Sequence, residues 1–159
     1  MPLKIGTAAP DFTLKCMTEH GLVDVTLSQN FGQYNTVLLF FPFAFTPVCA
    51  HEMCDVAGGI HLDVSLNAIV YGISVDSPFA QYAWVKQNEI SIKLLSDFNK
   101  TVIKAYDLIL PTLAGIGDTA ARAAVVIDKS GKIIHIEQTP VPKDLPDFDA
   151  LKTILRTLK

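Results

Sequence analysis

The feature that most constrains the fold is a continuous, almost entirely apolar run from Thr36 to Phe41, which stops at Pro42. A strand that is apolar at every position, rather than at every second one, needs cover on both faces. Proline ends such a strand because it cannot donate a hydrogen bond to the sheet ladder. We therefore expect a central strand buried within a sheet that is packed on both sides.

Further strands and helices follow from hydrophobic periodicity, capping residues and turn residues. The predicted strands are residues 12–14, 22–27, 68–75, 92–95, 123–127 and 132–136. The predicted helices are residues 47–61, 78–88, 99–106 and 147–158, and residues 112–119 are predicted to form a loop. This order predicts an α/β fold with a mixed central sheet, helices on both faces and one domain over residues 1–159.

Composition excludes several classes of function. Half of the 159 residues are hydrophobic and 18% are charged, enough for one buried core. A net charge of −3 and the lack of a lysine or arginine cluster argue against nucleic-acid binding. The longest apolar run, 37–45, is too short to cross a bilayer, and no signal peptide is recognisable. We expect a cytoplasmic protein that does not bind membranes.

The stretch from Pro42 to Cys54 carries the chemistry. Thr46-Pro47 is typical of a helix start, with proline at the first helical position, so Cys49 falls in the first turn. Free N–H groups and the helix dipole favour a thiolate there, and the thiolate is the nucleophilic form of cysteine. The Thr46 hydroxyl, three residues earlier, can both accept and donate a hydrogen bond. The alternative is that Cys49 is an ordinary buried core residue.

The spacing Pro42-x-x-x-Thr46-x-x-Cys49 resembles the signature of the peroxiredoxin family. Residues 6–14, 94–97 and 123–128 are also similar to that family, so the resemblance covers nearly the whole chain. It implies a thioredoxin-like fold with an N-terminal β-hairpin. It also implies a peroxidase that reduces hydrogen peroxide or organic hydroperoxides, without cofactor or metal.

The resemblance also assigns roles to residues. Cys49 would attack the peroxide and become a sulfenic acid, Thr46 would hold the peroxide, and Pro42 would shield the sulfur. Arg122, directly before the strand 123–127, matches an arginine that reaches the thiolate in the family. A guanidinium stays charged at any working pH and can stabilise both thiolate and transition state. Without Cys49, Arg122 would be interpreted as a solvated residue at a strand end.

A second cysteine, Cys54, is a candidate to resolve the sulfenic acid as an internal disulfide. The spacing resembles the PrxQ branch of the family, whereas the loop around Cys49, with Glu52 after it, resembles the AhpE branch. Five residues of helix separate two Cα atoms by about 7.5 Å of rise, so a disulfide needs local opening of the helix. Cys54 as a buried residue is the alternative. Thioredoxin or another thiol would be the reductant.

Three other classes compete with this hypothesis. A metal-binding protein would use Cys49, His51 and Cys54, with His135 as a distant ligand. A general disulfide oxidoreductase normally needs Cys-x-x-Cys, which is absent. The third class is a protein that keeps the same fold but binds partners without acting as an enzyme.

Two further expectations concern residues outside the motif. Cys16, beside the first strand, is interpreted as inert packing. The resemblance to the AhpE branch implies a homodimer, formed through an apolar patch near the active loop, whereas the resemblance to the PrxQ branch implies a monomer. The predicted patch consists of Phe43, Phe45, Phe79 and Trp84, and the alternative is that these aromatic side chains fill the core.

Overall fold

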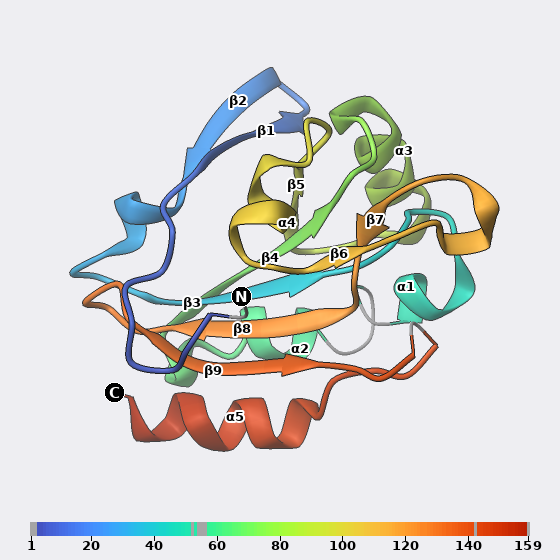
Figure 1. Cartoon of the computed structure of the whole chain (residues 1–159). Helices are drawn as coiled ribbons and strands as arrows, with labels where there is room; N and C mark the ends of the chain where they lie inside the picture. Colours follow the sequence, from blue (N-terminus) through green and yellow to red (C-terminus); the bar gives the residue numbers. More distant parts are fainter. Residues whose placement is uncertain (1–2, 52, 54–56, 142, 159) are drawn as a thin grey trace.

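The computed structural model describes residues 3–51, 53, 57–141 and 143–158 (Figure 1). Its main element is a mixed seven-stranded sheet with the strand order β2-β1-β5-β4-β3-β8-β9. The strands are β1 (Thr13–Thr18), β2 (Gly21–Thr26), β3 (Asn35–Phe40), β4 (Ala68–Ser74), β5 (Lys93–Ser96), β8 (Ala123–Ile127) and β9 (Ile133–Gln138). Two short strands, β6 (Ile109–Leu110) and β7 (Thr119–Ala120), pair separately.

Helices connect and cover these strands. They are α1 (Pro47–His51), α2 (Ala57–His61), α3 (Pro78–Asn88), α4 (Thr101–Ala105) and α5 (Phe148–Thr157), with 3-10 turns at Leu27–Asn30, Val64–Leu66 and Leu113–Gly115. The helix predicted over 47–61 corresponds to α1 and α2, and residues 52 and 54–56 between them lie outside the described part. Among the described helices, none has the length and apolar character needed to span a bilayer.

Strand β3 is the centre of the sheet, as predicted. All six of its residues are buried. It pairs in parallel with β4 and antiparallel with β8, and Phe40 lies opposite Ile73 on one side and Ala123 on the other. The antiparallel pairing matters for the site, because it brings the start of β8 to the end of β3.

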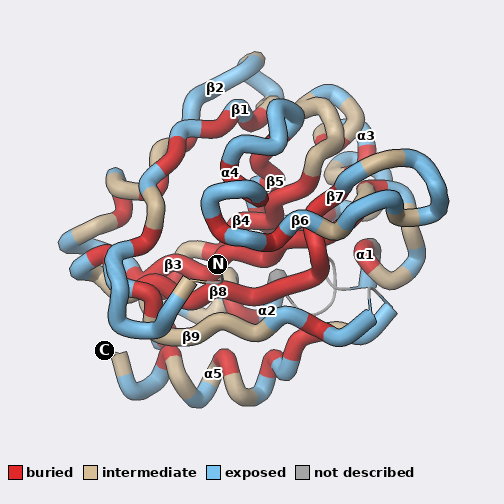
Figure 2. Tube along the Cα trace, viewed as in Figure 1, coloured by how far each residue is buried: buried red, intermediate tan, exposed pale blue. Residues whose placement is uncertain are grey.

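Two apolar clusters lie on opposite faces of the sheet, because alternate β3 side chains point to opposite sides. Leu38 and Phe40 belong to one cluster, which includes residues of the β1–β2 hairpin and α4. Val37 and Leu39 belong to the other, which includes residues of α1, α3 and α5. Figure 2 shows the buried sheet strands between more exposed peripheral segments. The predicted mixed α/β layering is confirmed.

Side-chain caps explain where the longer helices begin. The Ser77 hydroxyl accepts from the Ala80 N–H at 3.1 Å, and Pro78 is the first residue of α3, as predicted. The Asp147 carboxylate accepts from the Ala150 N–H at 3.0 Å and so caps α5.

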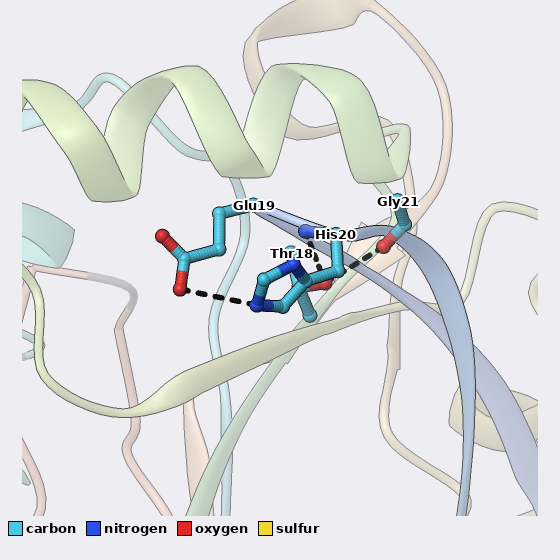
Figure 3. Close-up of polar contacts among 4 residues, drawn as sticks. All are labelled: Thr18, Glu19, His20 and Gly21. Atoms are coloured by element: carbon cyan, nitrogen blue, oxygen red, sulfur yellow. Dashed lines mark hydrogen bonds and ion pairs between the residues drawn. The ribbon is translucent and has the colours of Figure 1, made fainter.

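The first hairpin lies where it was predicted, but β1 extends four residues beyond the predicted strand 12–14, and Gly21, predicted in the turn, begins β2. The Thr18 hydroxyl donates to the Gly21 carbonyl at 2.9 Å and accepts from the His20 N–H at 3.2 Å (Figure 3). Gly21 has φ +105°, a conformation that glycine adopts at low cost. Glu19 Oε1 lies 3.4 Å from His20 Nε2 and both side chains are highly exposed, so this contact adds little stability.

The loop predicted over 112–119 contains more structure than expected. It includes the 3-10 turn Leu113–Gly115, and its last residue, Thr119, begins β7. Thr112 and Ala114 both have positive φ, which side chains other than glycine rarely adopt. A two-residue strand and a strained turn have no hydrophobic period, so the sequence did not predict them.

Candidate active site

The loop from Pro42 to Thr46 connects the end of β3 to α1 and is held at both sides. The Phe41 N–H donates to the Ile73 carbonyl at 3.0 Å, which extends the β3–β4 pairing by one residue. The Ala44 N–H donates to Asp76 Oδ2 at 2.8 Å. These bonds attach the loop to the end of β4, so the start of α1 has a defined position.

Asp76 is itself fixed by neighbouring side chains. The Ser74 hydroxyl donates to the same Oδ2 at 2.7 Å, and the Ser96 hydroxyl donates to the Asp76 carbonyl at 2.6 Å. Gln81 Nε2 donates to Ser74 Oγ at 2.9 Å. Sequence reasoning found only a helix cap in the Asp76-Ser77-Pro78 segment. It missed the role of Asp76 in supporting the loop, since no sequence signal links Asp76 to Ala44.

Phe45 occupies an unusual backbone conformation within this loop. Its φ is +67°, in the left-handed region that is costly for a residue with a side chain. Its side chain is 54% exposed, and its ring centroid lies 6.4 Å from that of Trp84. Trp84 is buried with 1% exposure, so its predicted place in an exposed apolar patch is wrong; it packs in the core beside Phe41.

Cys49 lies in the first turn of α1, as predicted, and its side chain is fully buried. It belongs to the cluster that includes Val37 and Leu39 of β3. Arg122 Nη2 donates a hydrogen bond to Cys49 Sγ at 2.9 Å. The contact places a guanidinium, which is charged at any working pH, directly beside the sulfur.

Arg122 reaches Cys49 because of the sheet topology. It directly precedes β8, and β8 begins opposite Phe40 at the end of β3. The side chain is 3% exposed, and the Thr139 N–H donates to its carbonyl at 3.0 Å. The predicted approach of Arg122 to Cys49 is therefore confirmed as geometry.

Thr46 and Pro42 also lie at Cys49. Thr46 Oγ1 donates to the Phe43 carbonyl at 2.9 Å, which uses its single proton and leaves oxygen lone pairs able to accept. The sequence alone left open which hydrogen bond the hydroxyl would donate. Pro42 is buried, which suits a residue that keeps water from the sulfur.

A pocket of about 200 Å³ connects these residues. Apolar side chains form most of its wall, and the sequence predicted the motif residues but neither Leu113 nor Lys143. The complete lining is Pro42, Phe43, Thr46, Pro47, Val48, Cys49, Leu113, Arg122 and Lys143. Figure 1 shows the connection between β6 and β7 beside α1, consistent with Leu113 in the wall. No periodicity or motif links Leu113 or Lys143 to Cys49.

The candidate resolving residue, Cys54, lies outside the described residues, and so does Glu52 of the motif loop. Cys16 lies in β1 with 4% exposure, in the cluster on the opposite face of the sheet from Cys49. Burial raises the pKa of the Cys16 thiol, and the Lys93 ammonium offsets part of that effect. These surroundings agree with the predicted inert packing role.

The metal-binding alternative gains no support. Within the described residues, no group of three or more His, Cys, Asp or Glu side chains could hold a metal ion. His51 is exposed on α1, and His135 lies on β9 opposite Val126. Cys54, the third proposed ligand beside Cys49 and His51, falls outside the described residues.

Comparisons with known proteins give a matching family, related sequences and similar solved structures. A model of the AhpC/TSA family matches residues 5–136. The chain is 32% identical over 142 residues to the chloroplastic 2-Cys peroxiredoxin BAS1 of Hordeum vulgare, covering 85% of this chain but only 65% of that protein's length. It is 30% identical to Peroxiredoxin-2 of Mus musculus, covering 95% and 77%. The crystal structure of reduced Plasmodium vivax 2-Cys peroxiredoxin superposes with a TM-score of 0.85 at 26% identity, covering 97% and 81%.

Proposed function

The chain belongs to the AhpC/TSA family of peroxiredoxins, and from this premise we propose that it is a thiol-dependent peroxidase acting through Cys49. The thioredoxin-like fold predicted from the sequence is confirmed by the likeness to solved peroxiredoxins. The observation that carries the proposal is the 2.9 Å hydrogen bond from Arg122 to Cys49 Sγ, at a pocket large enough for a small peroxide.

The proposed reaction needs only this sulfur and a hydroperoxide. The Cys49 thiolate attacks the terminal peroxide oxygen, so that an S–O bond forms while the O–O bond breaks. The sulfur is oxidised by two electrons to sulfenic acid, and the peroxide is reduced. The departing alkoxide, or hydroxide from hydrogen peroxide, takes up a proton and leaves as alcohol or water.

The surrounding residues have matching roles in this proposal. Arg122 stabilises the thiolate and the negative charge that moves onto the peroxide oxygens in the transition state. Thr46 accepts a hydrogen bond from the peroxide hydroxyl, since its own proton is given to the Phe43 carbonyl. Pro42 and its apolar neighbours exclude water, which strengthens both interactions.

Two further thiol reactions are needed to complete the cycle: one converts the sulfenic acid to a disulfide, and a second, with a thiol of the reductant, reduces that disulfide and regenerates Cys49. We propose that a thiol, from Cys54 of the same chain or from thioredoxin or a similar reductant, condenses with the sulfenic acid to form a disulfide and water. Mass spectrometry of peroxide-treated protein tests the first option: an internal Cys49–Cys54 bond supports it. Persistent Cys49 sulfenic acid beside a free Cys54 thiol would leave the external thiol as the resolving partner.

Assembly and location are also proposals. Phe45 and Phe79 are 54% and 59% exposed, respectively, and a second copy of the chain in a homodimer would cover such aromatic side chains. Light scattering of wild type and Phe79→Ser tests this arrangement. A cytoplasmic location is proposed as well and is tested by cell fractionation.

Stopped-flow oxidation by hydrogen peroxide tests the activity itself. Wild type is expected to lose the Cys49 thiol rapidly, and peptide mass spectrometry is expected to find Cys49 either with one added oxygen or joined in a disulfide. Cys49→Ser is expected to abolish the reaction, while Cys16→Ser, the matched control on the opposite sheet face, keeps it. If wild type reacts no faster than free cysteine, the proposed activity is wrong.

A further inference from the structure

Lys143 is the unexpected residue of the Cys49 pocket. It comes from the connection between β9 and α5, far along the chain from the motif. Its side chain is exposed, so it lies where the pocket meets solvent. Among the residues that the structure describes, no carboxylate forms an ion pair with it.

Charge is distributed unevenly around this pocket. The protein carries a net charge of −3, yet the described residues of the pocket lining include two cations, Arg122 and Lys143, and no carboxylate. Arg122 donates to Cys49 Sγ in the buried part, whereas Lys143 lies in the exposed part. A local positive potential at an entrance attracts anionic ligands and repels cationic ones.

The wall between the two cations is apolar. Pro42, Phe43, Val48 and Leu113 contribute to it, and Leu113 is supplied by the turn between β6 and β7. Hydrogen peroxide has no apolar surface and gains nothing from such a wall. An organic hydroperoxide gains binding free energy in proportion to the apolar area that it buries against this wall.

We propose that the preferred substrates are organic hydroperoxides with an apolar body and a carboxylate, in which Leu113 contacts the body and Lys143 pairs with the carboxylate. This inference rests on the proposed peroxidase activity and specifies its substrate class. The chemical step is unchanged: the terminal peroxide oxygen goes to Cys49 Sγ, and the remainder leaves as a hydroxy acid after taking up a proton. Lys143 is a specificity-determining residue that does not touch the reacting atoms.

A matched set of probes tests the charge. Cumene hydroperoxide bearing a para-carboxylate and the methyl ester of the same compound differ only in the anionic group. In stopped-flow experiments, wild type is expected to react about two- to fivefold faster with the acid than with the ester. This ratio falls as salt is added, because exposed ion pairs are screened.

Variants assign the effect to one side chain. Lys143→Gln is expected to bring the acid-to-ester ratio to about one, and Lys143→Arg to keep it. Lys104→Gln removes an exposed lysine that does not line the pocket and is expected to leave both rate constants unchanged. A ratio near one in wild type, or a ratio that Lys143→Gln leaves unaltered, would overturn the assignment to Lys143.

The apolar part has its own test. Leu113→Ala is expected to lower the rate with the ester about threefold or more relative to hydrogen peroxide. An unchanged ester-to-hydrogen-peroxide ratio would contradict the role of Leu113. If no peroxide oxidises Cys49, the peroxidase proposal itself fails; rapid oxidation by hydrogen peroxide with no preference for the acid defeats only the substrate class.

Discussion

Cys16 and Cys49 are almost equally buried, with 4% and 0% exposure, but they lie in different chemical surroundings. Cys49 Sγ accepts a hydrogen bond from the Arg122 guanidinium at 2.9 Å. Cys16 Sγ instead donates a weak hydrogen bond to the Met17 carbonyl at 3.8 Å. In the first arrangement a fixed positive charge lies beside the sulfur, whereas in the second the thiol itself is the hydrogen-bond donor.

The comparison teaches that burial alone does not decide whether a cysteine is reactive. Desolvation disfavours the charged form of any thiol, and it raises the pKa of Cys16 because Lys93 compensates only in part. At Cys49 a buried guanidinium lies in direct contact with the sulfur. A fixed positive charge inside an apolar wall can therefore make a nucleophile out of a residue that would otherwise be packing.

Removal of the guanidinium is the strongest way to break this contrast. Arg122→Met keeps the apolar stem but deletes the charge and the donor, and should slow oxidation of Cys49 by about 10²–10³-fold. Arg122→Lys, the matched control, keeps a charge without the planar fork and should retain part of the rate. Stopped-flow measurement with hydrogen peroxide checks both. Equal rates for wild type and Arg122→Met would show that Cys49 does not depend on this contact.

The support of the loop is the next target. Asp76→Ala leaves the Ala44 N–H and the Ser74 hydroxyl without their acceptor, and should lower the free energy of unfolding by about 1–2 kcal/mol. Urea denaturation measures this loss, and the rate of Cys49 oxidation should fall with it. Ser65→Ala is a suitable control, because Ser65 donates to Asp63 at an exposed position. If Cys49 were oxidised faster in Asp76→Ala than in wild type, the idea that the loop before α1 must be held in place would be contradicted.

Removal of the Thr46 hydroxyl should have a smaller effect on the oxidation of Cys49. Thr46→Val has nearly the same shape but no acceptor for the peroxide, and should reduce the oxidation rate about tenfold. Thr46→Ser keeps the hydroxyl and should stay close to wild type. Comparison of the two variants with one peroxide separates the hydrogen bond from packing. If Thr46→Val and Thr46→Ser are oxidised at the same rate, Thr46 has no role in holding the peroxide.

The smallest effect concerns Cys16 and the pH dependence of stability. Because its pKa is raised in the folded protein from an ordinary value of 9.0, the unfolded chain loses this proton first as pH rises. The protonated Cys16 thiol therefore makes its full contribution to the stability of the folded protein below about pH 9. That contribution is lost as the pH rises above this value. Relative to Cys16→Ala, the free energy of unfolding of wild type should fall by at most about 1.4 kcal/mol per pH unit in that window. Parallel curves for the two proteins would show that burial does not perturb Cys16.

Local features were predictable from the sequence because they depend on neighbouring residues. The buried run at β3, the Ser77 cap before Pro78 and the position of Cys49 at the start of α1 are of this kind. Each rests on periodicity, capping or proline chemistry within a few residues. The predicted exposure of Trp84 was wrong, since the burial of an aromatic side chain depends on what packs over it.

By itself, then, the sequence determined which cysteine begins a helix and which strand is buried on both faces. The family resemblance pointed to Arg122 at that cysteine, but only the tertiary structure explains how distant segments come to surround it. Arg122, 73 residues away from Cys49, reaches it because β8 runs antiparallel to β3 and begins where β3 ends. Leu113 and Lys143 reach the same pocket from two other connections. Contacts between distant segments depend on strand order and register, which no local pattern of residues specifies.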